Sequence, residues 1–430
     1  MNRRKFCTGV ASTAFTGPAL LSPAVSRGSS LALPPGKADS CIFIWLGGGA
    51  AQIDTFDPKK VGDPKEKTKK PGSAYRKIET AIQGHYLCEH MTGLAPRMDR
   101  GVILRSLHHD VIDEHAAAVN RMHVGRPASG TTLYPSIGSM VVHERPAGNG
   151  VPGYVLMGYP SATRGPGFLG PRHGYIYLTD TSAGAAGLRL PVDVSSTRMS
   201  RRNSLLNRLG RSQINKQPKA ERLREQMDSI QAGLKLAGPA FMKNFDLSSE
   251  SADLRNAYGG EFGQRCLLAR RLVQSGVRFV EVGFNLNFIN GTGWDTHNDG
   301  QENQHLLIQQ LDQALSTLLD DLEKRNLLDS TLIVVTTEFG RPPEFDAGGG
   351  RGHQSTAFSS LLLGGGLKTS QVIGQTDELA KKIIEQPVSI ADFHATIFQA
   401  MGIDPATELY DGDRPVPMTD HGKPVRQLFG

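Results

Sequence analysis

The sequence predicts an α/β fold in which a mostly parallel central sheet is flanked by helices. Residues 42–46, 102–104 and 332–335 are short, unbroken apolar runs, as expected of strands that crossover helices bury on both faces. Between residues 306 and 322, leucine and alanine recur at steps of three and four residues. This spacing predicts an amphipathic helix that ends near Asn326.

The first strand ends in a triple glycine at positions 47–49, which lacks the lysine and serine of a phosphate-binding loop. Nucleotide binding is therefore not expected. Lysine, aspartate, proline and glycine fill residues 59–70, which predicts a solvated loop. Residues 134–142 predict a turn and a short packed helix, and the glycine- and proline-rich residues 147–174 predict a long loop that could cover the site.

The second half of the chain also predicts alternating helices and strands. We expect a helix over residues 258–275, followed by strands at 279–284 and 360–363. Ser389 can cap a helix that begins at Ile390, and Gly402 follows its end. Arginine, lysine and leucine between residues 199 and 227 predict a basic helical insert around 199–250 in a domain that spans residues 38–430.

The first residues predict an export signal. Twin arginines at positions 3–4 precede an apolar, small-residue run over positions 7–25, which is the layout of a twin-arginine signal peptide. Gly17, Pro18 and Pro23 interrupt this run, so a stable transmembrane span is not expected. We therefore expect residues 1–30 to be a signal, the twin-arginine export machinery to be a partner, and the protein to be periplasmic or secreted.

Composition excludes few functions. The chain has 430 residues, 38% hydrophobic and 21% charged, which is ordinary for a soluble protein. Its net charge of +6 is spread along the chain without interleaved aromatic residues, so we expect no nucleic-acid partner and only a mild attraction to anionic substrates. The cysteines Cys41, Cys88 and Cys266 lack the close pairing of a zinc ribbon and can form at most one disulfide.

Four residues between positions 295 and 353 indicate a metal site. Asp295 and His297 are two positions apart, so in an extended loop both side chains can face one ion. Glu338 lies just past a strand end, where ligands bind in open α/β sheets, and a glycine-rich loop can bring His353 to the same edge. Asp54, shortly after the first strand, could join them. The alternative is that the carboxylates cap loops and the imidazoles lie on the surface.

Titratable residues also gather after the strand at 102–104. They include His108, His109, Asp113, Glu114 and His115, and they could serve a metal or general acid and base chemistry. The other interpretation is that Asp113 and Glu114 occupy the first turn of a helix, whose N-terminus is partly positive.

Several segments resemble known families. Residues 94–98, 122–127, 389–397 and 401–403 resemble the sulfatases of the alkaline phosphatase superfamily. Gly48 and residues 54–58, 337–341 and 352–353 more closely resemble an exported family of unknown function, numbered 1501, that is placed in that superfamily. The resemblance covers nearly the whole chain after the signal, and it implies an alkaline phosphatase/sulfatase-like fold.

The resemblance implies a divalent metal, which could be zinc, manganese or calcium. Its candidate ligands are Asp54, Asp295, His297, Glu338 and His353. Where sulfatases carry their nucleophilic Cys or Ser, this chain has residues 113–115 instead. Thr55 is then the nearby candidate nucleophile, or water attacks with His115 as base.

Together these features favour an exported, metal-dependent hydrolase of sulfate or phosphate esters, with an anionic ester such as a sulfated or phosphorylated glycan as substrate. Arg126, Arg341 and His109 are the expected substrate-binding residues, because arginine can pair with the anionic group. The alternative is a non-catalytic periplasmic protein that binds a metal or ligand and has lost the superfamily nucleophile.

Overall fold

A computed structural model describes residues 33–148, 150–181, 193–217, 223–224, 226–227, 230, 239–287, 289–297 and 300–430. The expected signal over residues 1–30 lies outside the described residues, as does part of the expected basic insert. Residues Pro34–Gly430 form one unit. None of the helices described here is long and apolar enough to cross a membrane.

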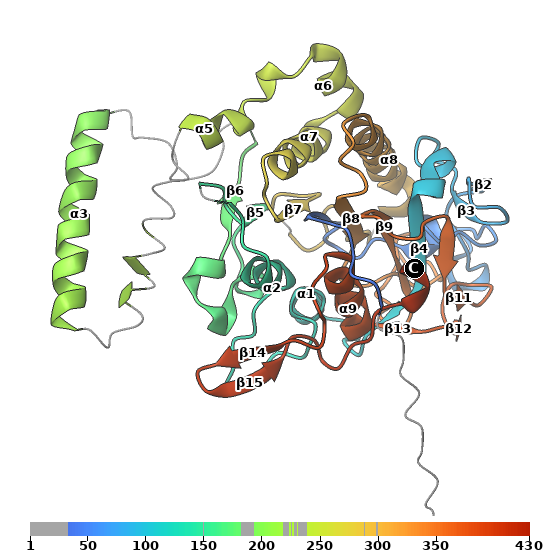
Figure 1. The fold of residues 1–430 in the computed structure, drawn as a ribbon. Coiled ribbons are helices and arrows are strands. Elements are labelled where there is room, and N and C mark those ends of the chain that lie inside the picture. The colour runs from blue at the N-terminus through green and yellow to red at the C-terminus, as the bar shows by residue number, and fades with distance from the viewer. Residues whose placement is uncertain are drawn as a thin grey trace, which may run out of the picture. The chain divides into compact units, whose positions relative to one another are not determined.

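One large sheet organises this unit (Figure 1). In the described part of the chain it has nine strands. In spatial order they are β10 (Gln371–Ile373), β4 (Gly101–His108), β9 (Phe358–Gly364), β8 (Thr331–Thr336), β1 (Ser40–Trp45), β7 (Phe279–Gly283), β5 (Tyr154–Met157) and β6 (Ile176–Leu178), with β13 (Val388–Ser389) beside β4.

The sheet is mostly parallel, which confirms the expected fold class. β1 runs parallel to both β7 and β8, and β5 runs parallel to β6 and β7. β9 is antiparallel to its neighbours β8 and β4. Because β9 reverses direction between them, β4 and β8 point the same way as β1 and β7. The carboxyl ends of these four strands therefore meet at one edge of the sheet.

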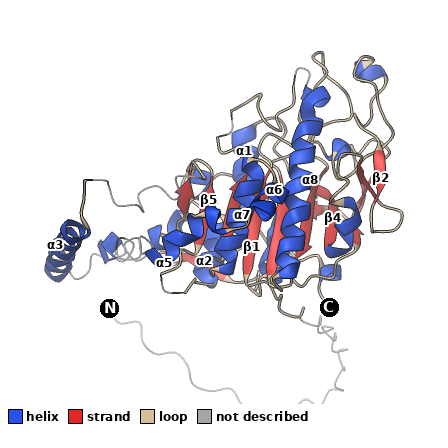
Figure 2. Ribbon diagram, turned by 90° about the horizontal axis from the view of Figure 1, so that it is seen from above, coloured by secondary structure: helices blue, strands red, loops and turns tan. Residues whose placement is uncertain are grey.

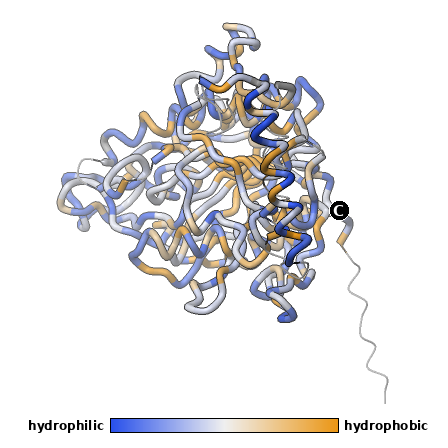
Figure 3. The backbone as a smooth tube through the Cα atoms, turned by 90° about the vertical axis from the view of Figure 1, so that its left-hand side faces the viewer, coloured by the Kyte–Doolittle hydropathy of each residue, from blue (hydrophilic) through white to orange (hydrophobic). Residues whose placement is uncertain are grey.

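Helices cover both faces of the sheet, one group above and one group below it in Figure 1, and Figure 2 looks onto the upper group with the strands behind it. The helices α7 (Glu261–Gln274) and α8 (Gly300–Lys324) pack on the face that carries Ile42, Ile44 and Val280. The helices α1 (His115–Val124) and α2 (Ile137–Glu144) pack on the face of Phe43 and Trp45. Figure 3 shows hydrophobic residues concentrated in the central strands. The helices are α1 (His115–Val124), α2 (Ile137–Glu144), α3 (Ser196–Lys216), α5 (Pro239–Met242), α6 (Ala252–Tyr258), α7 (Glu261–Gln274), α8 (Gly300–Lys324) and α9 (Ile390–Ala400).

In the part of the chain that the structure describes, three small antiparallel pairs lie outside the main sheet. They are β2 (Lys77–Glu79) with β3 (Tyr86–Cys88), β11 (Gln375–Thr376) with β12 (Ile383–Glu385), and β14 (Glu408–Asp411) with β15 (Arg414–Pro417). All three expected cysteines are buried and free, so the described residues contain no disulfide.

Two expectations from the sequence need correction. The helix expected over residues 258–275 is present as α7 but begins three residues later, because Gly259 and Gly260 separate it from α6, and Gly259 has a φ of 83° that favours glycine. The long loop expected over residues 147–174 contains β5, whose four residues stand between glycines and are too few to give a clear apolar pattern. Ser389 caps α9 as expected, and the short helix expected over residues 134–142 is α2, which Ser136 caps.

Candidate metal centre

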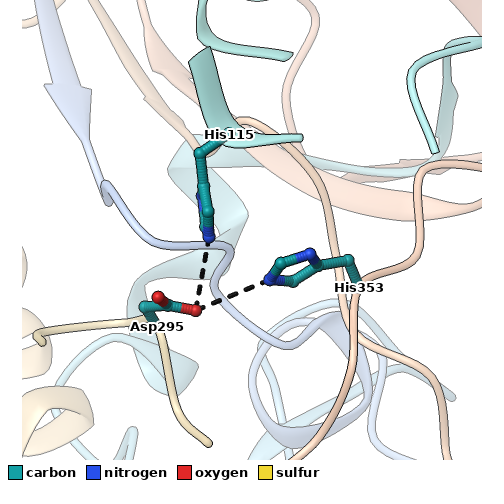
Figure 4. Close-up of side chains that lie close together, drawn as sticks. All are labelled: His115, Asp295 and His353. Atoms are coloured by element: carbon teal, nitrogen blue, oxygen red, sulfur yellow. Dashed lines mark ion pairs between the residues drawn. The ribbon is translucent and has the colours of Figure 1, made fainter. Parts of the chain in front are cut away.

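The loops at the shared strand edge bring together side chains from four parts of the chain. His115 is the first residue of α1, which follows β4, and Asp295 lies in the loop between β7 and α8. Glu338 follows β8 by two residues, and His353 precedes β9. Figure 4 shows the imidazoles of His115 and His353 pointing at the carboxylate of Asp295.

The start of α1 is fixed by its own sequence. The side chain of Glu114 accepts hydrogen bonds from the backbone N–H groups of Ala116 and Ala117, which caps the helix. This cap holds His115 at the first helical position, over the strand edge. The helix ends at Gly125, which adopts the left-handed conformation with a φ of 80°.

Asp295 Oδ1 is the centre of the cluster. It lies 3.4 Å from Nε2 of His115 and 3.6 Å from Nε2 of His353. Nε2 of His297 is 3.1 Å away, and Nη2 of Arg341 donates to the same oxygen at 2.5 Å. One carboxylate oxygen therefore has three imidazole nitrogens and one guanidinium around it.

A second layer of carboxylates orients two of these imidazoles. Nδ1 of His115 lies 2.9 Å from Oε1 of Glu338, and Nδ1 of His353 lies 2.5 Å from Oδ1 of Asp113. When a neutral imidazole donates Nδ1–H to a carboxylate, its Nε2 keeps the lone pair that a metal ion would bind. This arrangement is common around metal ions, because it fixes the tautomer and makes the imidazole a stronger ligand.

The residues fit a metal ion. His115, Asp295 and His353 each offer one ligand atom, and these three atoms all lie within 4.8 Å of one another. Asp295 is 4% exposed, so the ion would be shielded from bulk water on that side. Two imidazole nitrogens and one carboxylate oxygen make up a donor set that transition metals bind in catalytic sites with further open positions.

The charges of the cluster are strongly coupled. Burial opposes ionisation of Asp295, but His115, His353 and Arg341 hold the pKa of its carboxyl well below the usual range. Burial likewise opposes the charged form of His115, yet Asp295 and Glu338 raise the pKa of its imidazole to about 9. The cluster therefore attracts positive charge, which a metal ion would supply.

Asp54 and Thr55 lie near this edge but are engaged elsewhere. Both oxygens of the buried Asp54 carboxylate accept from Arg351, and they also accept from Ala74 N–H and Gln301 Nε2, each at 2.7 Å. Thr55 is also buried, and its hydroxyl donates to the carbonyl of Ala51 at 2.8 Å. The structure thus brings His115, Asp295, His297, Glu338 and His353 together but places Asp54 and Thr55 in separate contacts.

Arg341 and His109 donate hydrogen bonds to backbone carbonyl groups around the site. The Arg341 guanidinium is fully buried and, besides Asp295, donates to the carbonyl oxygens of Gly48 and Gly49. Nδ1 of His109 accepts from the backbone N–H of Val111, so its Nε2–H donates to the carbonyl of Glu338 at 2.6 Å. Burial lowers the pKa of this imidazole and so disfavours its charged form.

Arg126 lies away from the cluster. It follows the C-terminal end of α1, whereas His115 begins that helix, and ten helical residues span about 15 Å. Its guanidinium donates to the carbonyl of Pro417 at 2.6 Å and stacks over the ring of Tyr134. These contacts tie the end of α1 to the pair of β14 and β15.

Sequence reasoning gave no role to Arg351 or to Asp346, which lies 3.5 Å from Nδ1 of His297. Arg351 is a charged residue inside the glycine-rich stretch before His353, and this position was the available signal for it. Asp113 was considered for the first turn of a helix, and nothing in its spacing indicated a contact with His353, 240 positions away.

The solved structures that match this chain have low sequence identity to it. A protein in the alkaline phosphatase superfamily from Vibrio parahaemolyticus is 11% identical, with 86% of this chain and 68% of that chain covered and a TM-score of 0.39. PsFucS1 sulfatase from Pseudoalteromonas sp. is 11% identical, with 91% and 72% covered and a TM-score of 0.39. Phosphonate monoester hydrolase SpPMH from Silicibacter pomeroyi is 11% identical, with 90% and 76% covered and a TM-score of 0.36. At this level of similarity, none of the three says which reaction this chain performs.

No curated protein matches the chain. A family model described as "Protein of unknown function (DUF1501)" matches residues 38–429.

Proposed function

Because this chain belongs to the DUF1501 family, whose function is unknown, we propose from the site itself that it is a metal-dependent hydrolase of sulfate or phosphate esters. One observation carries the proposal. Three imidazole nitrogens converge on Asp295 Oδ1, and the two that belong to His115 and His353 are each backed by a carboxylate. The sulfatase-like segments named above supply the class of substrate.

His115, Asp295 and His353 would hold the ion. A divalent cation bound there would neutralise part of the charge of the ester and lower the pKa of a water molecule. The mixed nitrogen and oxygen donors favour zinc or manganese over calcium, which takes six to eight oxygen ligands. This assigns His115 to the ion rather than to the role of base that the sequence suggested.

His297 is the residue placed to move protons. Its side chain is 38% exposed, more than that of His115 or His353, and it lines a cavity beside the cluster. In hydrolysis, the oxygen of water forms a bond to sulfur or phosphorus, and the bond from that atom to the ester oxygen breaks. His297 takes one proton from the water and gives it to the departing oxygen, so that the alcohol leaves and the second proton stays with the sulfate or phosphate.

A binding protein without catalysis is the second candidate. Thr55, the expected nucleophile, has its hydroxyl buried in a hydrogen bond to Ala51, which favours this alternative. Both candidates share the proposed export by the twin-arginine route to the periplasm or the outside of the cell. Proteins that use this route fold before export, which would allow a metal to be loaded first.

Metal content and turnover test the proposal together. We would measure metals by mass spectrometry in purified wild-type protein and in His353→Ala, and would follow release of sulfate and phosphate from 4-nitrophenyl esters. His143→Ala is the matched control, since His143 lies on α2 and pairs with Glu144. We expect a metal ion and turnover in wild type and control, and neither in His353→Ala. Metal without turnover would favour the binding protein, and a wild type without metal would end both proposals.

A further inference from the structure

A cavity opens directly beside the metal cluster. Its volume is about 390 Å³, within the range of small-molecule sites. The loop after β7 and the first three turns of α8 form its walls, and Asp295 and His297 belong to both the cluster and the cavity. A molecule in the cavity would therefore reach the ion site with one end.

Two buried side chains that line the cavity have hydrogen-bonding atoms without a partner among the described residues. Gln304 is 1% exposed, and its Oε1 accepts from Gln301 at 2.9 Å, but its Nε2 has no acceptor. Thr296 is 6% exposed, and its Oγ1 is also without a partner. Buried polar groups are nearly always hydrogen-bonded, because an unmet one loses the free energy it had in water. Both atoms are closed off from the cavity as they lie, so each side chain would have to turn toward it for a ligand oxygen to restore these bonds.

The described walls of the cavity carry little net charge. Among the lining residues that the structure describes, Asp295 is the one acidic residue and is paired with the buried Arg341 at 2.5 Å, and none is a lysine or arginine. Asn303, Gln304 and Gln310 contribute amides, which both donate and accept hydrogen bonds. Hydroxyl groups also do both, so amides match them better than they match a charged group.

We infer that this cavity binds the neutral, hydroxyl-rich alcohol half of the substrate, a sugar ring, with Gln304 and Thr296 as its hydrogen-bonding anchors. Leu306 and Leu307 supply apolar surface for the carbon skeleton of the ring. The inference rests on the proposed function for the ester group, which would lie toward the cluster. Recognition of the sugar itself needs no metal.

Binding of neutral sugars to the full-length protein in EDTA tests this inference without turnover. The probes are D-glucose, D-galactose, maltose and lactose, followed by saturation-transfer NMR and isothermal titration calorimetry. We expect at least one of them to bind, and we expect Thr296→Val and Gln304→Met each to weaken that binding about tenfold. Gln313→Met is the matched control on α8, because Gln313 is exposed and donates to the carbonyl of Ala257.

Thr296→Ser keeps the hydroxyl and should retain binding, and circular dichroism would show that each variant is folded. If wild type binds none of the four sugars, or if Thr296→Val and Gln304→Met bind as tightly as Gln313→Met, the inference is wrong. Sugar binding without ester turnover would contradict the proposed hydrolase and support the sugar site. Turnover of 4-nitrophenyl esters without sugar binding would do the reverse.

Discussion

Arg351 and Asp54 form a fully buried ion pair in which Nε lies 2.8 Å from Oδ2 and Nη2 lies 3.0 Å from Oδ1. Arg351 precedes His353 by two residues, and Asp54 follows β1. The pair therefore ties the loop that carries one candidate metal ligand to the loop after the first strand. Arg351 also donates to the carbonyl of Gly72 at 2.7 Å, so its guanidinium has no room for a substrate.

Asp54→Asn should lower stability and leave metal content unchanged. The substitution leaves the Arg351 charge buried without its counterion, which costs about 3–5 kcal/mol. Urea unfolding of the metal-free protein measures the loss, and mass spectrometry of the folded variant should still find the wild-type amount of metal. Loss of metal with unchanged stability would instead make Asp54 a ligand, as the family resemblance implied.

Asp113→Asn should weaken metal binding without unfolding the protein. Asp113 is 78% exposed, so its substitution costs little stability, but its carboxylate accepts from Nδ1 of His353 at 2.5 Å. Removing such a partner lowers metal affinity about 10- to 100-fold. Competition with a zinc-binding dye measures the change. Asp110→Asn is the control, because Asp110 is equally exposed and pairs with Arg121, and equal affinities in the two variants would contradict the assignment.

Arg341→Met should destabilise the protein by about 3–5 kcal/mol, because it leaves the buried Asp295 carboxylate without its guanidinium. The double variant Arg341→Met/Asp295→Asn should lose less than the sum of the two single variants, since it removes both charges. Urea unfolding of the metal-free proteins gives the three values. A substrate-binding role would show a different pattern, with wild-type stability and a raised KM for 4-nitrophenyl sulfate.

Much of the fold could be predicted because strands buried on both faces are apolar throughout. That pattern revealed β1, β4 and β8, and the leucine spacing revealed α8. It could not reveal that β9 runs against its neighbours, because an apolar run reads the same in both directions. The later start of α7, after Gly259 and Gly260, depends on backbone conformation and left little trace in the spacing of apolar residues.

The site was predictable to the level of the sheet edge. Side chains that follow parallel strands gather at one edge, which is why His115, Asp295 and His353 could all be proposed before the structure. Which side chains face the ion and which ones hold those side chains in place could not be predicted, because this depends on side-chain direction. Asp54 illustrates this limit, because it follows a strand as a ligand would, yet its partner Arg351 stands 297 positions away.

Acid should destabilise the protein through His394, a residue far from the cluster. His394 lies on α9, and its Nε2–H donates to the carbonyl of Met122 at 2.8 Å. Burial lowers the pKa of this imidazole from 6.5 to about 4. Between these two values the unfolded chain binds a proton that the folded chain does not, so stability is full above about pH 6.5 and falls as the pH drops toward 4. This pKa difference corresponds to a loss of about 3 kcal/mol in the free energy of unfolding.

His394→Gln should remove this part of the pH dependence. Urea unfolding of the metal-free wild type and variant, followed from about pH 7 to about pH 4, should give a shallower loss of stability in the variant, although its stability at pH 7 is lower. His173 needs a parallel variant, because burial lowers the pKa of its imidazole to about 4 as well. His173 is half-buried and its charged form stays partly hydrated, so His173→Gln should change the slope less. If His394→Gln and wild type lose stability in parallel, the buried imidazole is not the group that acid attacks.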